Sequence, residues 1–193
     1  MAVRVGVLAL QGDFEAHSKS LLQAGAVPVE VRTRQQLEKI RGLIIPGGES
    51  TTMLRLLNVL DLMGPLRDFG SQKPIFGTCA GAILLANQVL NPVQESLELM
   101  DLTVQRNAYG RQIDSRVAVL APDATFEQRV GAGKLEAVFI RAPIIRRAGE
   151  NVTVLAEYEG DPVLVEQGMH MAATFHPELT ADSRVHRLFL SKL

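Results

Sequence analysis

Apolar and polar residues follow two different patterns along the chain, and the pattern changes near its middle. The first half holds short continuous apolar runs, typical of parallel strands buried on both faces, and each is followed by a segment with helical spacing. We expect strands at Val3–Leu10, Val27–Arg32, Gly42–Pro46 and Lys73–Gly77, and helices at Phe14–Ala24, Arg34–Arg41, Ser50–Phe69 (interrupted around Gly64-Pro65) and Gly81–Gln88. This repeated order predicts a mainly parallel sheet with helices on both faces.

The second half consists mostly of strand-like runs with few helices between them. We expect strands at Leu102–Ala108, Arg116–Ala121, Glu136–Arg141, Val152–Tyr158, Val163–Gln167 and Met171–Phe175, with a hairpin turn at Tyr158–Pro162. A helix at Ala181–Leu193 would close the chain with Val185, Leu188 and Phe189 on one face. No internal repeat, low-complexity segment or linker divides the sequence, so we expect residues 1–193 to form a single α/β domain.

Composition and charge exclude several classes of function. The net charge of −1 gives no attraction to nucleic acid or anionic membranes, and 7 Phe, 2 Tyr and no Trp leave little for base stacking. The apolar N-terminal run is too short to span a bilayer and lacks the layout of a signal peptide. Cys79 is the only cysteine, so no internal disulfide can form, which fits a reducing cytosol. We therefore expect a cytoplasmic protein with no nucleic-acid or membrane partner.

That cysteine stands in a turn whose sequence suits a nucleophile. Gly77-Thr78-Cys79-Ala80-Gly81 has the pattern G-x-C-x-G between an expected buried strand and an expected helix. In a nucleophile elbow, small neighbours let the chain turn sharply and hold the central residue in a strained conformation. The helix N-terminus favours the thiolate, and the N–H of Ala80 would face a developing oxyanion. A lone cysteine is more often an inert buried residue, but this glycine pattern favours a reactive Cys79.

A cysteine nucleophile needs a base, and His176 is the strongest candidate. Pro177 restricts the backbone around His176, and in an extended chain Glu178 would point the same way and orient the imidazole. Taken alone, His-Pro-Glu is more often a solvated turn at the end of a strand; together with the cysteine turn it indicates a catalytic pair. His170 lacks a carboxylate at the same offset, and His17 and His186 are predicted to be surface or packing residues.

A glycine pair follows the third expected strand, in Pro46–Thr52. Gly47 and Gly48 would let backbone N–H groups approach a ligand at the carboxyl edge of the sheet, and Gly48 is a natural second oxyanion donor. A phosphate-binding loop is the alternative, but no G-x-x-x-x-G-K-[ST] motif occurs; Gly131–Lys134 is a partial match only. The histidines lack metal-ligand spacing, so no metal site is expected.

These motifs together resemble a known family, the class I triad-type glutamine amidotransferases. Within it, the chain is similar to the glutaminase subunits of pyridoxal 5′-phosphate synthases. The blocks that carry the resemblance are spread over nearly the whole chain in family order: Val7–Gly12, Pro46–Thr52, Gly77–Gly81, Arg106–Gln112, Phe139–Pro143 and Phe175–Glu178. The resemblance implies a flavodoxin-like three-layer α/β/α fold with a mostly parallel central sheet.

The resemblance also implies roles for individual residues. Cys79 would be the nucleophile, His176 the base and Glu178 its orienter, and glutamine would contact Gly47, Gly48, Glu49, Arg106, Ile140 and Arg141. Apart from the resemblance, Gln11 and Gly12 follow the first expected strand and should lie near the same edge of the sheet, so we expect Gln11 to help couple partner docking to formation of the oxyanion hole. The glutaminase would need no cofactor, because pyridoxal 5′-phosphate is the product of the complex.

The partner that the family implies is a barrel-shaped synthase subunit, in a ring of twelve copies of each subunit. Three alternatives stay open at this point. They are the glutaminase of another amidotransferase such as imidazole glycerol phosphate synthase, a cysteine hydrolase or protease of similar fold, and a non-catalytic regulatory subunit.

Overall fold

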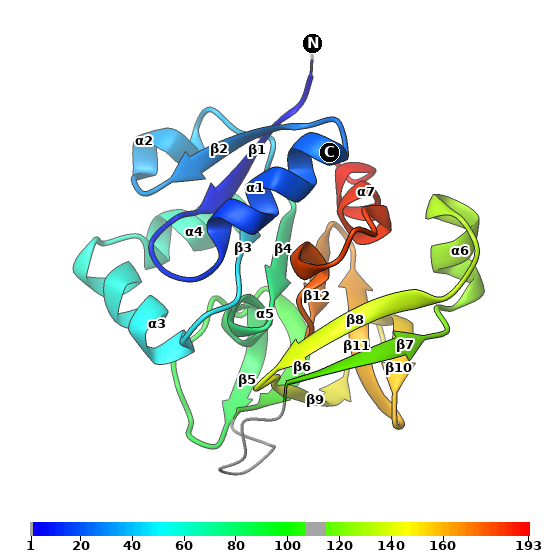
Figure 1. The fold of residues 1–193 in the computed structure, drawn as a ribbon. Coiled ribbons are helices and arrows are strands. Elements are labelled where there is room, and N and C mark those ends of the chain that lie inside the picture. Colours follow the sequence, from blue (N-terminus) through cyan, green and yellow to red (C-terminus); the bar gives the residue numbers. More distant parts are fainter. Residues whose placement is uncertain (1, 107–114) are drawn as a thin grey trace.

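The computed structural model describes residues 2–106 and 115–193. Within these residues a seven-stranded sheet forms the centre of the molecule, in the order β10-β11-β12-β4-β3-β1-β2 (Figure 1). Its strands are β1 (Arg4–Leu8), β2 (Val27–Val31), β3 (Gly42–Ile45), β4 (Ile75–Thr78), β10 (Thr153–Tyr158), β11 (Asp161–Gln167) and β12 (His170–Ala173). The run from β2 to β12 is parallel, and β11 and β10 extend it antiparallel.

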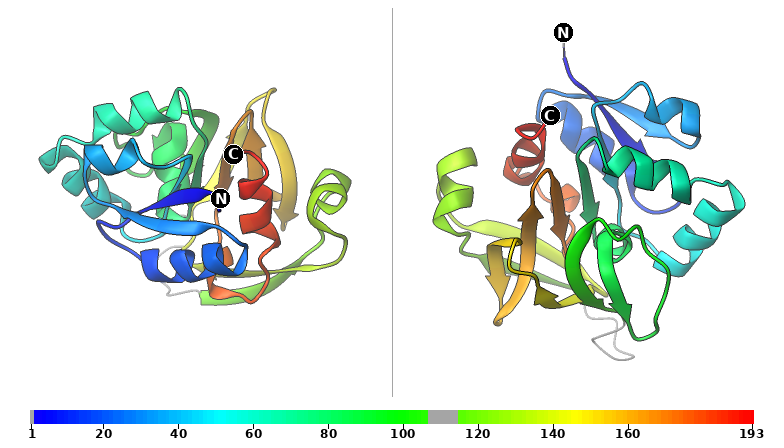
Figure 2. Two further views of the ribbon diagram at one scale, coloured as in Figure 1. Left: turned by 90° about the horizontal axis from the view of Figure 1, so that it is seen from above. Right: turned by 180° about the vertical axis from the view of Figure 1, so that it is seen from behind.

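Helices cover both faces of this sheet, as the alternation of buried side chains requires (Figures 1 and 2). Leu43 and Ile45 face one core with α2 (Arg34–Leu37), α3 (Ser50–Val59), α4 (Met63–Gly70) and α5 (Ala80–Leu85). Ile44, between them on β3, faces the other core with α1 (Phe14–Gln23), α6 (Ala124–Val130) and α7 (Arg184–Leu190). The predicted three-layer arrangement with a mostly parallel central sheet is therefore confirmed.

Two smaller sheets accompany these layers. The strands β5 (Ala86–Leu90), β6 (Met100–Gln105) and β9 (Ile144–Ala148) pack on the core of α3 and α4. The antiparallel pair β7 (Ser115–Leu120) and β8 (Leu135–Ile140) packs on the opposite core. In Figure 1 this pair runs across the lower end of the central sheet, where the parallel strands have their carboxyl ends.

Several element boundaries differ from the sequence prediction, each for a local reason. The helix after Cys79 ends at Leu85 rather than Gln88, because the carbonyls of Leu84 and Leu85 accept hydrogen bonds from Leu97 and Leu99. The 50–69 helix breaks at residues 60–62, not around Gly64-Pro65. Pro65 instead occupies the first turn of α4, where its missing N–H would have no partner within the helix.

Other differences lie in the second half of the chain. The helix α6 and the strands β5 and β9 were not predicted, and the closing helix begins at Arg184 rather than Ala181. The hairpin turn is confirmed: Glu159 and Gly160 both have positive φ (53° and 87°), as a tight two-residue turn requires. The 107–112 part of the Arg106–Gln112 block lies outside the described residues. In the part that is described, no helix is long and apolar enough to cross a membrane.

Candidate active site

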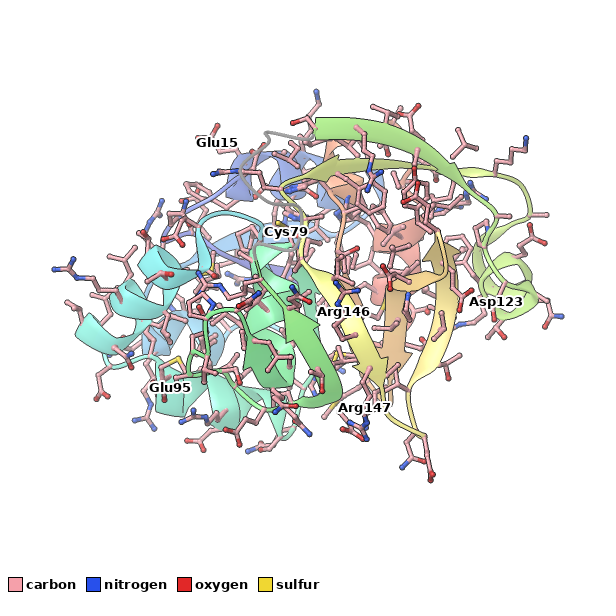
Figure 3. The ribbon with its side chains drawn as sticks, turned by 90° about the horizontal axis from the view of Figure 1, so that it is seen from below. Glu15, Cys79, Glu95, Asp123, Arg146 and Arg147 are labelled. Atoms are coloured by element: carbon pink, nitrogen blue, oxygen red, sulfur yellow. The ribbon has the colours of Figure 1, made fainter. Side chains whose placement is uncertain are left out.

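The carboxyl ends of the parallel strands bring together the residues that the motifs pointed to. The segments after β3, β4 and β12 carry the glycine pair, Cys79 and His176, and the end of β8 reaches the same edge. Figure 3 views this edge from below, with Cys79 labelled close to the centre of the molecule. Such an edge is where open α/β sheets bind ligands, so its side chains define the candidate site.

Cys79 occupies the strained turn that its neighbours predicted. Its φ of 48° and ψ of −105° are unusual for a residue with a side chain, and its N–H donates to the Ala173 carbonyl at 2.8 Å. A Cβ at Gly77 would overlap the Gly81 carbonyl, and one at Gly81 would overlap the Ile45 carbonyl. The prediction of two obligatory small neighbours is therefore confirmed, and the turn presents Cys79 at the start of α5.

His176 and Glu178 form a buried pair. Nδ1 of His176 lies 2.7 Å from Oε1 of Glu178, and the two residues are only 8% and 6% exposed. The pairing was predicted, but its geometrical reason was wrong. Pro177–Leu179 form a single 3-10 turn rather than an extended chain, and this turn brings Glu178 back to His176. The backbone N–H of His176 is anchored on the Val138 carbonyl of β8 at 2.8 Å.

The other side of the His176 ring meets Cys79. Burial lowers the pKa of His176, but hydrogen bonds with Cys79 and Glu178 outweigh it and raise the pKa to about 10. Such a shift means that the imidazolium is held between two groups that favour its charge. Gly47 packs against this contact, since a Cβ there would overlap Cε1 of His176 and lie 3.2 Å from Cβ of Cys79.

A cavity of about 220 Å³ opens beside Cys79. The Ile140 carbonyl oxygen, at the end of β8, lies 3.9 Å from Sγ of Cys79. Arg141 follows with a φ of 44°, in the left-handed region that residues with a side chain adopt uncommonly. The residues that line the cavity are Gln11, Gly48, Glu49, Ser50, Cys79, Ile83, Arg106, Ile140, Arg141, Pro143 and His176.

The glycine loop is held from the side of β1. The side-chain oxygen of Gln11 accepts the Glu49 N–H at 2.9 Å, and a Cβ on Gly48 would overlap that side chain. The Gly47 carbonyl lies against Gly12, so a Cβ at Gly12 would overlap it. The predicted neighbourhood of Gln11 and the glycine pair is confirmed, and residues 11 and 12 lie directly against Gly47 and Gly48.

Glu49 and Arg106 place opposite charges at the cavity wall. Partial burial acts to raise the pKa of Glu49, but hydrogen bonds from Thr52 and Thr51 at the start of α3 lower it to about 2. Arg106 is 8% exposed, donates to Oγ1 of Thr51 at 2.7 Å and lies 3.6 Å from Oε1 of Glu49. Glu49 therefore stays a carboxylate at neutral pH and also caps α3.

The remaining histidines, and the loop at residues 131–134 that was set aside as a phosphate-binding motif, have other structural roles. His170 lies at the opposite edge of the sheet, where its Nδ1 accepts the Ile75 N–H at 3.2 Å. His17 and His186 are fully buried, so the surface alternative for them is wrong. His17 contacts Glu178, which motif reasoning missed; its spacing of four from Leu21 on one helix face was the available signal. Arg184 donates to the carbonyls of residues 131–134, a loop that thus presents acceptors rather than anion-binding N–H groups.

Comparison with known proteins agrees with this geometry. The model of the SNO glutamine amidotransferase family matches residues 7–193. The chain belongs to this family. Two members are named pyridoxal 5′-phosphate synthase subunit PdxT. That of Solibacter usitatus (strain Ellin6076) is 64% identical over 190 residues, which cover 98% of this chain and 99% of that protein. That of Thermotoga maritima is 47% identical over 189 residues, covering 97% and 98%. The resemblance stated from the motifs is confirmed.

Solved structures extend the family relation to the fold. A crystal structure of a glutamine amidotransferase superposes with a TM-score of 0.88 at 44% identity, covering 97% of each chain. The structure of PurLQS from Thermotoga maritima gives a TM-score of 0.78 over 99% of each chain. At 17% identity, the second likeness concerns the fold alone. The SNO family member thus has the mixed α/β fold of glutamine amidotransferases.

Proposed function

We propose that this SNO family protein is the glutaminase subunit of a pyridoxal 5′-phosphate synthase. It hydrolyses L-glutamine to glutamate and ammonia and passes the ammonia to a synthase subunit. The observation that carries the proposal is the contact between the thiol of Cys79, the imidazole of His176 and the carboxylate of Glu178 beside one cavity. In it, His176 contacts Cys79 on one side and lies 2.7 Å from Glu178 on the other. The names of nearly full-length relatives at 64% and 47% identity support the assignment to this synthase.

The three catalytic residues divide the chemistry between them. The Cys79 thiolate attacks the amide carbon of glutamine, and the imidazolium of His176 gives its proton to the departing nitrogen, so that ammonia leaves a thioester. Neutral His176 then takes a proton from water, which attacks the thioester and releases glutamate and the thiolate. Glu178 makes no bond to substrate. Its carboxylate holds the ring in one orientation and stabilises the imidazolium.

The cavity walls complement the two ends of glutamine. The ionised carboxylate of Glu49 would receive the α-ammonium group, while Arg106 and Arg141 would receive the α-carboxylate. The Ile140 carbonyl, 3.9 Å from Sγ of Cys79, would accept from the side-chain amide. Gly47 leaves room for the His176 ring beside Cys79, and specificity for glutamine comes from charges at one end of the substrate and backbone at the other.

The oxyanion formed in each half of the reaction needs donors beside Cys79. We assign them to the N–H groups of Ala80 and Gly48. Ala80 begins α5, directly after the strained turn, and Gly48 lines the same cavity. Gln11, which holds the neighbouring Glu49 N–H, would transmit docking of the partner to the 47–48 peptide.

The wider setting of the reaction follows from the same assignment. Residues 1–193 act as one glutaminase domain in the cytoplasm, docked on a barrel-type synthase subunit in an assembly of twelve copies of each. The glutaminase itself needs no cofactor, and pyridoxal 5′-phosphate is the product of the complex.

The decisive experiment supplies glutamine labelled in its amide nitrogen to the protein together with a cognate synthase. Label should enter pyridoxal 5′-phosphate even when unlabelled ammonium is present outside, and Cys79→Ala should abolish the transfer. A glutamine-analogue alkylator should label Cys79 stoichiometrically, with protection by glutamine. Glutamine hydrolysis that feeds imidazole glycerol phosphate synthase instead, or peptide cleavage without glutamine hydrolysis, would refute the proposal.

A further inference from the structure

The pair of His176 and Glu178 is linked to a series of buried side chains from three other elements. His17 of α1 and His186 of α7, here called the histidine pair, are both 0% exposed. Nδ1 of His17 lies 3.0 Å from Nε2 of His186, and Nε2 of His17 lies 3.0 Å from Oγ1 of Thr78. The same Nε2 lies 3.3 Å from Oε2 of Glu178. The helices α1 and α7 lie next to one another over this face of the sheet (Figures 1 and 2).

The second oxygen of Glu178 makes this contact informative. Oε1 faces His176, whereas Oε2 is buried and, among the described residues, has no hydrogen bond of good geometry. Nε2 of His17 lies within ion-pair distance of Oε2 and can donate to it if it carries the ring proton. A buried carboxylate oxygen without a donor is costly, so the proton of His17 belongs on Nε2, shared between Glu178 and Thr78.

The position of this proton on Nε2 of His17 determines which other ring nitrogens of the histidine pair are protonated. With Nε2 protonated in a neutral ring, Nδ1 of His17 is an acceptor and receives the Nε2–H of His186. Nδ1 of His186 is then a bare acceptor, and within the described residues it has no partner. The reversed assignment would turn a lone pair of His17 toward the Glu178 carboxylate and leave His186 with a buried, unpaired N–H. The first assignment leaves the cheaper defect.

We propose that His17 is a positioning residue for glutamine hydrolysis, which holds Glu178 through an Nε2–H donor and so aims Oε1 at His176. This inference rests on the proposed function of the site. The carboxylate then has a ring nitrogen on each side, Nδ1 of His176 at 2.7 Å from Oε1 and Nε2 of His17 at 3.3 Å from Oε2, and this arrangement opposes rotation away from His176. His186 selects the tautomer of His17 by donating to its Nδ1.

The charge state of the histidine pair fits this role. Burial lowers the pKa of His17 well below its ordinary value, and the nearby His186 and His176 lower it further. Burial also lowers the pKa of His186, to about 4. The titratable groups that face His17 are His186 from α7 and His176 and Glu178 from the segment after β12. Both members of the histidine pair are therefore neutral at neutral pH.

The first test measures the tautomer in the unaltered protein, so that folding of a variant is not at issue. Nitrogen-15 NMR of the imidazoles should show His17 protonated on Nε2 and bare on Nδ1 throughout pH 6–9. A His17 ring protonated on Nδ1, or on both nitrogens, would overturn the proposal. This readout needs neither glutamine nor the synthase, so its failure is distinct from a failure of the proposed function, which would appear as unaltered protein without glutaminase activity.

The second test uses His17→Leu and His17→Gln in the complex with the synthase. His17→Leu removes the donor, so kcat for glutamine should fall at least tenfold while KM stays within twofold. The acidic limb of the pH profile of kcat should move to higher pH in this variant, because the Glu178 carboxylate protonates more readily once it has lost a donor. His17→Gln can donate from a similar position and should keep at least a third of kcat.

A matched control is His170→Leu, which removes another buried histidine at the opposite edge of the sheet and should leave kcat and the pH profile unchanged. Equal losses of kcat in His17→Leu, His17→Gln and His170→Leu, without a shift of the acidic limb, would show a merely structural role and overturn the proposal. If His17→Leu does not fold, the tautomer and His17→Gln decide.

Discussion

At Gly47 the absence of a side chain leaves room for the contact between Cys79 and His176. A Cβ at this position would overlap Cε1 of His176, yet Gly47 has an ordinary φ, so alanine is excluded by the neighbours and not by the backbone. Gly47→Ala should therefore reduce glutaminase kcat at least a hundredfold. Gly64→Ala is the matched control, because nothing lies within 4 Å of its would-be Cβ and its φ is not positive, and it should keep full activity. Equal activity of the two variants would show that the packing of Gly47 against His176 is not needed for turnover.

We expect Glu178 to act on the ring of His176 and not on the substrate. Glu178→Gln replaces a charge by a neutral amide of nearly the same shape, so the pKa of His176 should fall from about 10. We expect kcat to drop 10- to 1,000-fold but to stay measurable, whereas Cys79→Ala should abolish turnover. NMR titration of His176 together with steady-state kinetics checks both parts. Wild-type kinetics in Glu178→Gln would refute the orienting role.

At the scale of single elements, two of the helices that begin with an acidic cap make a matched pair, because Glu49 of α3 borders the cavity and Asp123 of α6 does not. Glu49 accepts the N–H groups of Thr51 and Thr52 at the start of α3, and Asp123 accepts that of Phe126 at the start of α6. Alanine at either position should lower the free energy of unfolding by about 1 kcal/mol. Glutaminase activity should fall in Glu49→Ala alone, measured at saturating synthase. Loss of activity in Asp123→Ala as well would make the effect one of stability.

The element boundaries also show which features of the fold can be predicted from the sequence. Local patterns sufficed for the parallel strands and for the strained turn, because buried apolar runs and paired glycines act over a few neighbours. The end of α5 at Leu85 could not be predicted, because it depends on the distant N–H groups of Leu97 and Leu99. The contact of His17 with Glu178 escaped for the same reason, since 161 positions separate them and only the packing of α1 against the sheet brings them together.

At the scale of the whole molecule, the buried histidine pair makes stability depend on pH. The pKa of His186 falls to about 4 on folding, so the unfolded chain binds its proton first as pH drops. The stability that depends on a neutral His186 is fully present above the ordinary pKa of 6.5 and is lost as the pH falls from 6.5 to 4. For a pKa shift of this size the loss is on the order of 3 kcal/mol. His17 acts in the same direction. Urea unfolding of wild type and His186→Phe between pH 7.5 and 4.5 should give a flatter pH dependence for the variant. Parallel curves would contradict this.

Docking of the synthase subunit should control the rate of the glutaminase. Ammonia released into bulk water is lost to the synthase, so turnover is useful only when the partner is docked. Gly47 and Gly48 let the peptide between them change orientation at low steric cost, and Gln11 and Gly12 lie against this peptide. Docking near Gln11 would select the peptide orientation that completes the oxyanion hole, a population shift driven by binding energy. We expect kcat to rise at least tenfold on adding the synthase, equivalent to about 1.4 kcal/mol of barrier, and Gln11→Ala to lose most of that rise while still binding the partner. An isolated subunit that hydrolyses glutamine at the full rate would rule this coupling out.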